Sequence, residues 1–208
     1  MQNSYKLILI TNRGDTPLSE YLSFIKICAE SGVTSVQLRE KNATLESLLE
    51  FGYCLKEILE PLKVPLIIND HINLAPQLQA DGVHLGQTDG DPRQARAILG
   101  KDKIIGWTIE TEEQLEQANQ LPLTYSAVGA IFPSRTKHDI KVWGLSELSK
   151  LAKKSKHPLN AIGGITTQNV RHVMETGVAG ISVIGTLHEA KDPAEVARTL
   201  RHMIDHYV

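Results

Sequence analysis

A run of alternating polar side chains near residue 37 combines an amide with two cations. Gln37, Arg39 and Lys41 occupy every second position, with Leu38 and Glu40 between them. Alternate residues of a β-strand share one face, so the three polar groups are expected to point the same way. That arrangement suits a polyanionic ligand. The ordinary alternative is a solvated charged loop, because Lys and Arg side chains are mostly exposed.

Two carboxylates follow two other aliphatic runs. Asn69 and Asp70 come directly after residues 66–68, and Asp89 lies just beyond residues 82–85. One or two carboxylates are the sparse oxygen set that Mg²⁺ uses when substrate phosphates and water complete its coordination. The pair therefore predicts a magnesium site, with helix capping and solvation as the alternatives. His84 is expected to be an interior histidine, and His71 is a weaker candidate for acid–base chemistry.

Two further segments could bind phosphate. Residues 131–139 (IFPSRTKHD) are dense in hydroxyls and cations, although any polar loop looks similar. Gly163, Gly164 and Gly185 follow two later aliphatic runs, and glycine lets backbone N–H groups approach phosphate oxygens closely. The alternative is that these glycines only form tight turns between strands and helices.

The scaffold for these groups is indicated by eight short β-branched or aliphatic runs. They are residues 7–10, 35–38, 66–68, 82–85, 104–107, 126–128, 160–162 and 181–184. Helical patterns alternate with them; one has an apolar stripe of Leu18, Leu22, Ile25 and Ala29. Helix starts are indicated where Asp91 and Asp192 each precede a proline, and where Thr111 and Gln114 form a capping-box pattern.

Eight successive strand–helix units predict an α/β fold, a (β/α)8 or TIM barrel, with residues 1–208 as a single domain. A doubly wound open sheet is the structural alternative. In a barrel the functional groups lie at the carboxyl ends of the strands, and the turns after the last two strands commonly bind phosphate. Both rules favour functional roles for the residues named above.

Composition and charge limit the partners. The formal net charge is −2, so no global positive field attracts nucleic acid or an anionic membrane. No apolar run approaches the ~20 residues of a membrane helix, and no leader pattern is present, so we expect a cytoplasmic protein. Cys28 and Cys54 stand among apolar residues and are expected to be buried, reduced and structural.

The residues alone thus predict two anion sites in one barrel mouth. One is cationic and assisted by Mg²⁺, and the other is lined by backbone groups after the last two strands. Such a site could transfer a group from a diphosphate to a phosphorylated acceptor. The pattern does not identify either carbon skeleton.

From about residue 6 to residue 203 the chain resembles the thiamine phosphate synthase family. The resemblance rests on five ordered motifs: residues 36–41 (VQLREK), 66–70 (LIIND), 81–89 (DGVHLGQTD), 128–137 (VGAIFPSRTK) and 161–165 (AIGGI). It implies the condensation of 4-amino-2-methyl-5-hydroxymethylpyrimidine diphosphate with 4-methyl-5-hydroxyethylthiazole phosphate, giving thiamine phosphate and diphosphate. It also implies loss of diphosphate before attack, through a pyrimidine-stabilised cation and without a covalent enzyme intermediate.

The resemblance assigns roles residue by residue. Asp70 and Asp89 match the Mg²⁺ ligands, and Gln37 matches the pyrimidine-binding amide. The residues matching diphosphate contacts are Arg39, Lys41, Asn69 and Lys137. The residues matching the thiazole phosphate site are Ser134, Thr136, Gly164, Ile184 and Gly185. Thr108 stands where the family usually has serine, so its hydroxyl can still donate a hydrogen bond. By this resemblance the catalytic residues are Lys137, Arg39, Lys41 and Thr108.

Two departures from the family pattern bear on affinity. Glu110 adds a negative charge near the predicted diphosphate site, and Gly185 replaces a frequent serine and removes a donor. The main alternative function is a thiazole tautomerase-type isomerase of the same fold, which would not need the magnesium and diphosphate set; a non-catalytic relative is the third hypothesis. The predicted partners are small-molecule substrates, and the sequence leaves open whether the protein forms a homo-oligomer. Residues 133–139 are the candidate lid over the site.

Overall fold

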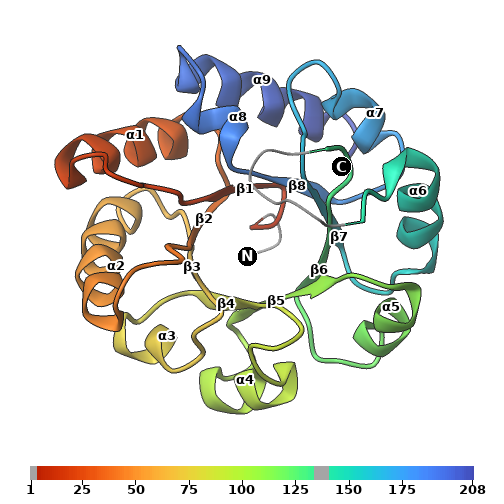
Figure 1. Ribbon diagram of the computed structural model, residues 1–208, viewed down its shortest axis with the longest axis horizontal. Coiled ribbons are helices and arrows are strands. Elements are labelled where there is room, and N and C mark those ends of the chain that lie inside the picture. The colour runs from red at the N-terminus through yellow and green to blue at the C-terminus, as the bar shows by residue number, and fades with distance from the viewer. Residues whose placement is uncertain (1–3, 134–140) are drawn as a thin grey trace.

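The computed structural model describes residues 4–133 and 141–208, and its parallel strands form a closed barrel in chain order (Figure 1). The strands are β1 (Leu7–Ile10), β2 (Ser35–Leu38), β3 (Leu66–Asn69), β4 (Gly82–Leu85), β5 (Ile104–Ile109), β6 (Tyr125–Val128), β7 (Leu159–Ile162) and β8 (Gly180–Val183). Because β8 pairs with β1, the sheet has no free edge, and the open-sheet alternative is wrong.

Helices surround the barrel (Figure 1). In the described part of the chain they are α1 (Leu18–Glu30), α2 (Leu45–Leu59), α3 (Leu74–Gln77), α4 (Pro92–Leu99), α5 (Glu112–Ala118), α6 (Gly144–Lys154), α7 (Val170–Met174), α8 (Gly185–His188) and α9 (Pro193–Asp205). The predicted (β/α)8 class is therefore confirmed. The extra element is the single-turn α8 between β8 and α9.

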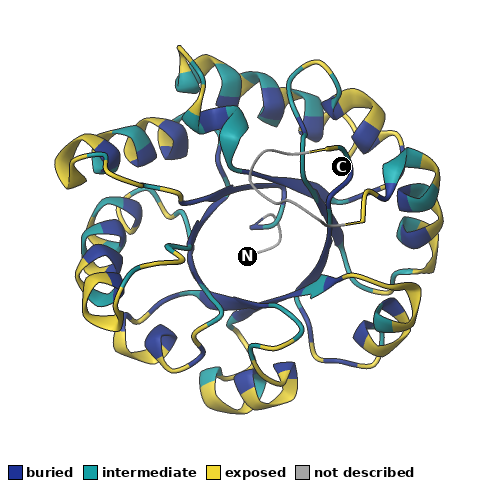
Figure 2. Ribbon diagram, viewed as in Figure 1, coloured by how far each residue is buried: buried dark blue, intermediate teal, exposed yellow. Residues whose placement is uncertain are grey.

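Two separate apolar clusters hold the layers together. Outward-facing strand residues pack against the helices in the larger cluster, and Figure 2 shows the buried face of each helix turned toward the barrel. A smaller cluster that includes Ile8, Ile67 and Tyr125 packs inside the barrel. Strand residues alternate between these two environments, so each inner face continues directly into the mouth.

Helix caps form as the sequence predicts. The Thr111 hydroxyl accepts a hydrogen bond from the Gln114 backbone N–H, and the Gln114 side-chain oxygen accepts one from the Thr111 backbone N–H, which completes a capping box. The Asp91 and Asp192 carboxylates accept from the backbone N–H groups of Arg93 and Glu195. Each such cap stabilises its helix by about 1 kcal/mol.

Two helical expectations need correction. Leu18 is 37% exposed, because the inner face of α1 at that level is filled by the Tyr21 ring, which packs against Phe24 and Phe51. Cys54 is only half-buried, since it flanks the buried stripe of α2, whereas Cys28 is buried as expected. Both cysteines are free thiols.

The barrel closes through a seam between its first and last elements. The Lys6 ammonium pairs with the Asp205 carboxylate at 2.8 Å and donates to the Val208 carbonyl at 3.0 Å. These contacts join β1 to α9 across almost the whole sequence. Over the described residues, no helix is long and apolar enough to cross a membrane.

Candidate active site

The end of β2 carries the predicted amide and cations. Gln37 is 2% exposed on the inner face of the barrel, Arg39 is half-buried just beyond the strand, and Lys41 is exposed in the following turn. The Thr11 hydroxyl accepts from the Arg39 amide at 2.8 Å and donates to the Arg39 carbonyl at 3.3 Å. The backbone that carries these cations is therefore fastened to the loop after β1.

The two predicted metal ligands follow adjacent strands. Asp70 lies directly after β3 with φ +66°, and its amide donates to the His84 carbonyl at 2.8 Å. Asp89 is half-buried in the loop after β4, where one of its oxygens accepts from the Gly86 amide at 2.8 Å. Asn69 pairs in register with His84. Both carboxylates thus belong to the same edge of the barrel mouth.

The two carboxylates on this edge of the mouth fit a Mg²⁺ ion that the protein coordinates only in part. Within residues 4–133 and 141–208, no group of three or more His, Cys, Asp or Glu side chains could hold a metal ion. Two carboxylates without a third protein ligand match an ion whose other positions are filled by substrate phosphate and water. Asp70 and Asp89 are compatible with such a shared site and with no closed protein cage.

A buried polar relay lies beneath the mouth. His84, 8% exposed, contacts the Tyr125 hydroxyl through Nδ1 at 2.8 Å and the Thr108 hydroxyl through Nε2 at 2.9 Å. Gly106 makes this possible, because a Cβ there would collide with both the Tyr125 ring and the His84 ring. Burial raises the pKa of Tyr125, so it remains a neutral phenol, and a hydrogen bond links it to Gln37.

The relay changes the interpretation of three strand residues. His84 is an interior histidine, as expected, and the Thr108 hydroxyl is shared with it. The Thr108 carbonyl also accepts a hydrogen bond from the side-chain amide of Gln87. Tyr125 was missed from sequence, although alternation along β6 would have placed it on the inner face, opposite Gly106 in register. Glu110 is exposed directly after β5, and His71 is exposed after β3.

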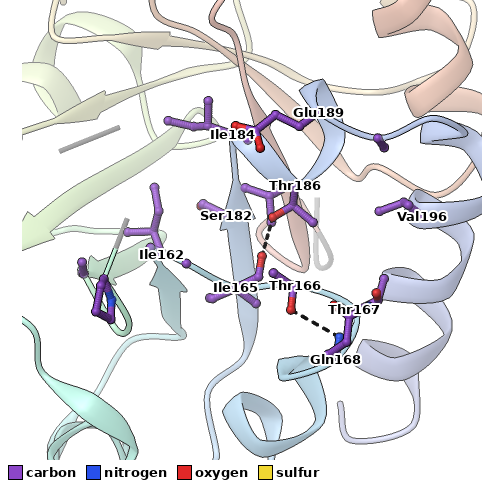
Figure 3. Close-up of a pocket in the computed structure, with 18 residues that line it drawn as sticks. Ile162, Ile165, Thr166, Thr167, Gln168, Ser182, Ile184, Thr186, Glu189 and Val196 are labelled. Carbon is purple, nitrogen blue, oxygen red and sulfur yellow. Dashed lines mark hydrogen bonds between the residues drawn. The ribbon is translucent and has the colours of Figure 1, made fainter. Parts of the chain in front are cut away.

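A cavity of about 490 Å³ lies at the ends of β7 and β8 (Figure 3). Its wall includes residues 162–168 and 182–186. Gly164 has φ +64°, and a Cβ at that position would stand 2.7 Å from the Pro133 carbonyl oxygen. Only glycine fits this turn without strain. Gly185 opens α8 on the opposite side, with Ile184 immediately before it.

Local hydrogen bonds fix the shape of this cavity. The Asn169 side chain donates to the Gly164 carbonyl at 2.9 Å and accepts from the Thr166 amide at 2.8 Å. The Thr186 hydroxyl donates to the Ile165 carbonyl, which ties the two turns together across the pocket (Figure 3). These partners hold the glycine turns in place. The cavity between them is lined by glycines and aliphatic residues together with polar residues, which are Thr166, Thr167, Gln168, Ser182, Thr186 and Glu189.

Three predicted site residues cannot be located. Ser134, Thr136 and Lys137 lie outside the described residues, as does most of the candidate lid at residues 133–139. The structure does place Arg39, Lys41, Asn69, Asp70 and Asp89 on the β2–β4 side of the mouth, and Gly164, Ile184 and Gly185 on the β7–β8 side. An edge with two cations and two carboxylates therefore shares the barrel mouth with a cavity between two glycine turns, an arrangement suited to two anionic substrates.

Comparisons with known proteins agree with this arrangement. A family model described as thiamine monophosphate synthase matches residues 7–187. The chain is 48% identical over 205 residues to the thiamine-phosphate synthase of Chlamydia abortus, covering 98% of this chain and 97% of that one. It is 38% identical over 205 residues to the thiamine-phosphate synthase of Vibrio parahaemolyticus, covering 98% and 100%.

Solved structures extend the likeness to the fold. Thiamine phosphate pyrophosphorylase from Pyrococcus furiosus superposes with a TM-score of 0.89 at 31% identity, covering 100% of this chain and 98% of that one. The 3-hexulose-6-phosphate synthase of Salmonella typhimurium reaches a TM-score of 0.76 at 16% identity, covering 98% and 100%. The second match shows a shared barrel and carries no information about substrates.

Proposed function

Because the chain belongs to the thiamine monophosphate synthase family, we propose that it joins 4-amino-2-methyl-5-hydroxymethylpyrimidine diphosphate to 4-methyl-5-hydroxyethylthiazole phosphate. The products are thiamine phosphate and diphosphate. The observation that carries this proposal is the pairing, in one mouth, of a cationic and acidic edge with a cavity of about 490 Å³ between two glycine turns. One substrate anion is assigned to each side.

The donor binds on the β2–β5 side in this proposal. Gln37 is buried below the mouth and offers its amide to the aminopyrimidine, while Arg39 and Lys41 lie further out toward the diphosphate. Asn69 adds an amide from the next strand. Lys137 completes the cationic set by resemblance to the family, from outside the described residues.

Asp70 and Asp89 would hold Mg²⁺ in this arrangement. The ion supplies positive charge to the diphosphate and remains accessible to its oxygens, as two protein ligands allow. Asp89 keeps one oxygen engaged with the Gly86 amide, which restricts the direction of the other. Each carboxylate also repels the diphosphate, so the cations nearby are needed to orient it.

The chemistry we propose is dissociative. The bond between the pyrimidine methylene carbon and the diphosphate oxygen breaks first, and the electron pair leaves with the diphosphate. The thiazole nitrogen then forms the new carbon–nitrogen bond. Negative charge grows on the leaving group, so preorganised cations such as Arg39, Lys41 and Lys137 lower the barrier. No side chain needs to act as a nucleophile, and His71 and His84 need no catalytic role.

The acceptor binds on the β7–β8 side. Its phosphate is recognised by backbone N–H groups around Gly164, Ile184 and Gly185, with Ser134 and Thr136 contributing hydroxyls by resemblance. Recognition by main chain explains why glycine stands at φ +64° beside Pro133. The missing serine at position 185 removes one side-chain donor but leaves the backbone groups.

The decisive experiment is a reconstitution. Purified protein, Mg²⁺ and both substrates should give thiamine phosphate and diphosphate in equal amounts, and no product should form when either substrate is withheld. A protein that instead interconverts isomers of a thiazole carboxylate phosphate would be the tautomerase-type isomerase. The names of the relatives at 38–48% identity favour the transferase.

The order of bond breaking needs a separate measurement. Donor labelled with ¹⁸O in the bridging position should scramble the label into non-bridging positions during partial turnover, if the cation and diphosphate form reversibly before attack. Unscrambled label at high conversion would favour direct displacement.

A further inference from the structure

A chain of hydrogen bonds links the loop after β1 to the turn after β8. The Asn12 amide donates to the Tyr21 hydroxyl oxygen at 2.8 Å, and that hydroxyl lies 2.6 Å from His188 Nε2. His188 Nδ1 lies 2.7 Å from the carbonyl oxygen of Ile184. Tyr21 belongs to α1 and His188 to α8, so the chain crosses the β1–β8 seam of the barrel.

The direction of each bond follows from its ends. The Ile184 carbonyl can only accept, so Nδ1 carries the imidazole proton. In the neutral ring Nε2 is then an acceptor, and the Tyr21 hydroxyl donates to it while accepting from the Asn12 amide. Every group is satisfied with a neutral His188 in one tautomer. An imidazolium would bring a second donor against the Tyr21 hydroxyl and displace that proton.

The surroundings favour this neutral state. Stacked and tilted ring contacts with Tyr21 at 5.7 Å and Phe24 at 4.9 Å enclose the imidazole. This burial lowers the pKa of His188, and it outweighs the opposing effects of the Ile184 hydrogen bond and of the Glu40 and Glu189 carboxylates. Arg13, in the loop after β1, lowers the pKa of Tyr21 by its positive charge, whereas the negative charge of Glu40 raises that pKa.

The same loop is anchored on its other side. The Arg13 amide donates to both oxygens of Glu40, at 3.1 and 3.2 Å, and Thr11 holds the Arg39 backbone. The loop after β1 therefore stands between the cationic edge at β2 and the turn at β8. The Ile184 carbonyl also accepts from the backbone amides of Leu187 and His188, at 3.2 and 3.3 Å. A change at the Tyr21–His188 contact can therefore reach Ile184 through both the side chain and the main chain of His188.

We infer that Tyr21 and His188 are positioning residues for the acceptor phosphate, because they fix the Ile184 carbonyl and with it the orientation of the adjacent Ile184–Gly185 backbone that lines the cavity. The inference rests on the proposed function, which places the thiazole phosphate at that turn. Neither residue is among those that line the cavity, so neither is a catalytic residue.

Steady-state kinetics of three variants test this role. Tyr21→Phe removes only the hydroxyl, and His188→Asn keeps a donor near the Nδ1 position but loses the acceptor for Tyr21. Each should raise the thiazole phosphate KM by about five- to tenfold, the effect of one lost hydrogen bond, while kcat and the pyrimidine diphosphate KM stay within about twofold. The double variant should show no further increase, because both changes break the same contact.

Tyr53→Phe is the matched control. It also removes a tyrosine hydroxyl, one that donates to the Gln77 carbonyl at 3.3 Å on the outside of α2. Its two KM values should equal those of the wild type. Thermal unfolding of all variants reports any general loss of stability, which would lower the apparent kcat by reducing the folded fraction and leave both KM values unchanged. A rise of both KM values together would contradict a positioning role.

The pH profile supplies an independent measurement. The wild-type thiazole phosphate KM should rise as the pH falls through the pKa of His188, which lies below the usual value of 6.5. His188→Asn should lose that component. The substrate phosphate itself titrates near pH 6. The quantity to compare at each pH is therefore the thiazole phosphate KM of His188→Asn divided by that of the wild type. A constant ratio would overturn the inference.

The outcomes separate the two proposals. A wild-type protein that makes no thiamine phosphate refutes the proposed function and removes the basis of this inference. An active wild type whose Tyr21→Phe and His188→Asn variants keep the wild-type acceptor KM overturns the inference alone.

Discussion

The two sides of the barrel mouth recognise their ligands by different means. On the β2–β5 side the groups assigned to the donor and its metal are side chains: two amides, two cations and two carboxylates among the described residues, above a buried relay from His84 to Tyr125 and Thr108. On the β7–β8 side no Lys or Arg is among the described residues that line the cavity, which lies between the glycine turns at Gly164 and Gly185. Removing charge should harm the first side, and adding bulk should harm the second.

This difference follows from what each anion does in the proposed reaction. The diphosphate leaves and gains negative charge, so it needs preorganised positive charge supplied by Arg and Lys. The acceptor phosphate does not react, so fixed N–H dipoles that bind it equally throughout are sufficient. The predictions below test that division.

The largest effect is expected at Lys137. Lys137→Ala should lower kcat by about 10²–10³, the range for losing one preorganised donor to a developing charge, with little change in the acceptor KM. Lys137→Arg should restore activity only in part, because a planar fork places its charge differently. Lys101→Ala, at an exposed position, is the control. A normal single-turnover rate in Lys137→Ala would end its assignment to the leaving group.

The next largest effect is expected for Asp89→Asn, which should weaken the binding of Mg²⁺. Asparagine keeps an acceptor for the Gly86 amide but removes the charge, so the fold of the loop is retained. Half-maximal activity should need about tenfold more Mg²⁺ or higher, because even changes behind the metal ligands cost about 10–100-fold in affinity. Asp102→Asn, an exposed change elsewhere, should leave the Mg²⁺ titration unaltered. An identical titration for both variants would contradict the site.

Gly164→Ala tests the backbone side. The new Cβ would stand 2.7 Å from the Pro133 oxygen in a left-handed conformation, at a strain of about 1–3 kcal/mol. We expect the acceptor KM to rise by about tenfold with the donor KM unchanged. Gly177→Ala has similar φ strain (+90°) but its nearest neighbour is 3.9 Å away, so it separates strain from crowding of the cavity. Equal KM changes in the two variants would remove Gly164 from the phosphate site.

The smallest effect is expected at Glu110. Glu110→Gln removes an exposed negative charge after β5. It should lower the KM for the pyrimidine diphosphate by about twofold at low salt, and this gain should disappear as salt screens the charge. Glu116→Gln, also exposed, is the control. A gain that persists at high salt would show that the effect is not electrostatic.

The strand ends were predictable because their signal is local. β1, β2 and β4 begin and end where the aliphatic runs do, and polar residues follow each of them within two positions. β5 extends two residues beyond its predicted end, to Ile109, because Thr108 and Ile109 pair with Ala127 and Val128 of the next strand. Pairing of that kind is set by a neighbour and is invisible in the run itself.

The relay and the Tyr21–His188 contact were not predicted for the same reason. His84, Gly106 and Tyr125 are far apart in sequence and meet only through the register of β4, β5 and β6. Tyr21 and His188 are separated by 167 positions. Each residue alone has an ordinary interpretation, as an interior histidine, a turn glycine or a core aromatic. Composition and periodicity carry no information about which of them touch.

The seam between β1 and α9 makes activity a late event in folding. Lys6 and Asp205 are 199 positions apart, and closing so long a loop is slow compared with forming the neighbouring strand–helix units. The donor site lies on β2–β5 and the acceptor site on β7–β8, so the two sites share one mouth only once the barrel has closed. During synthesis an emerging chain can assemble its early helices and strands yet cannot bring the two substrates together. Recovery of turnover after denaturation should therefore coincide with the slowest refolding phase, not with the recovery of helical signal.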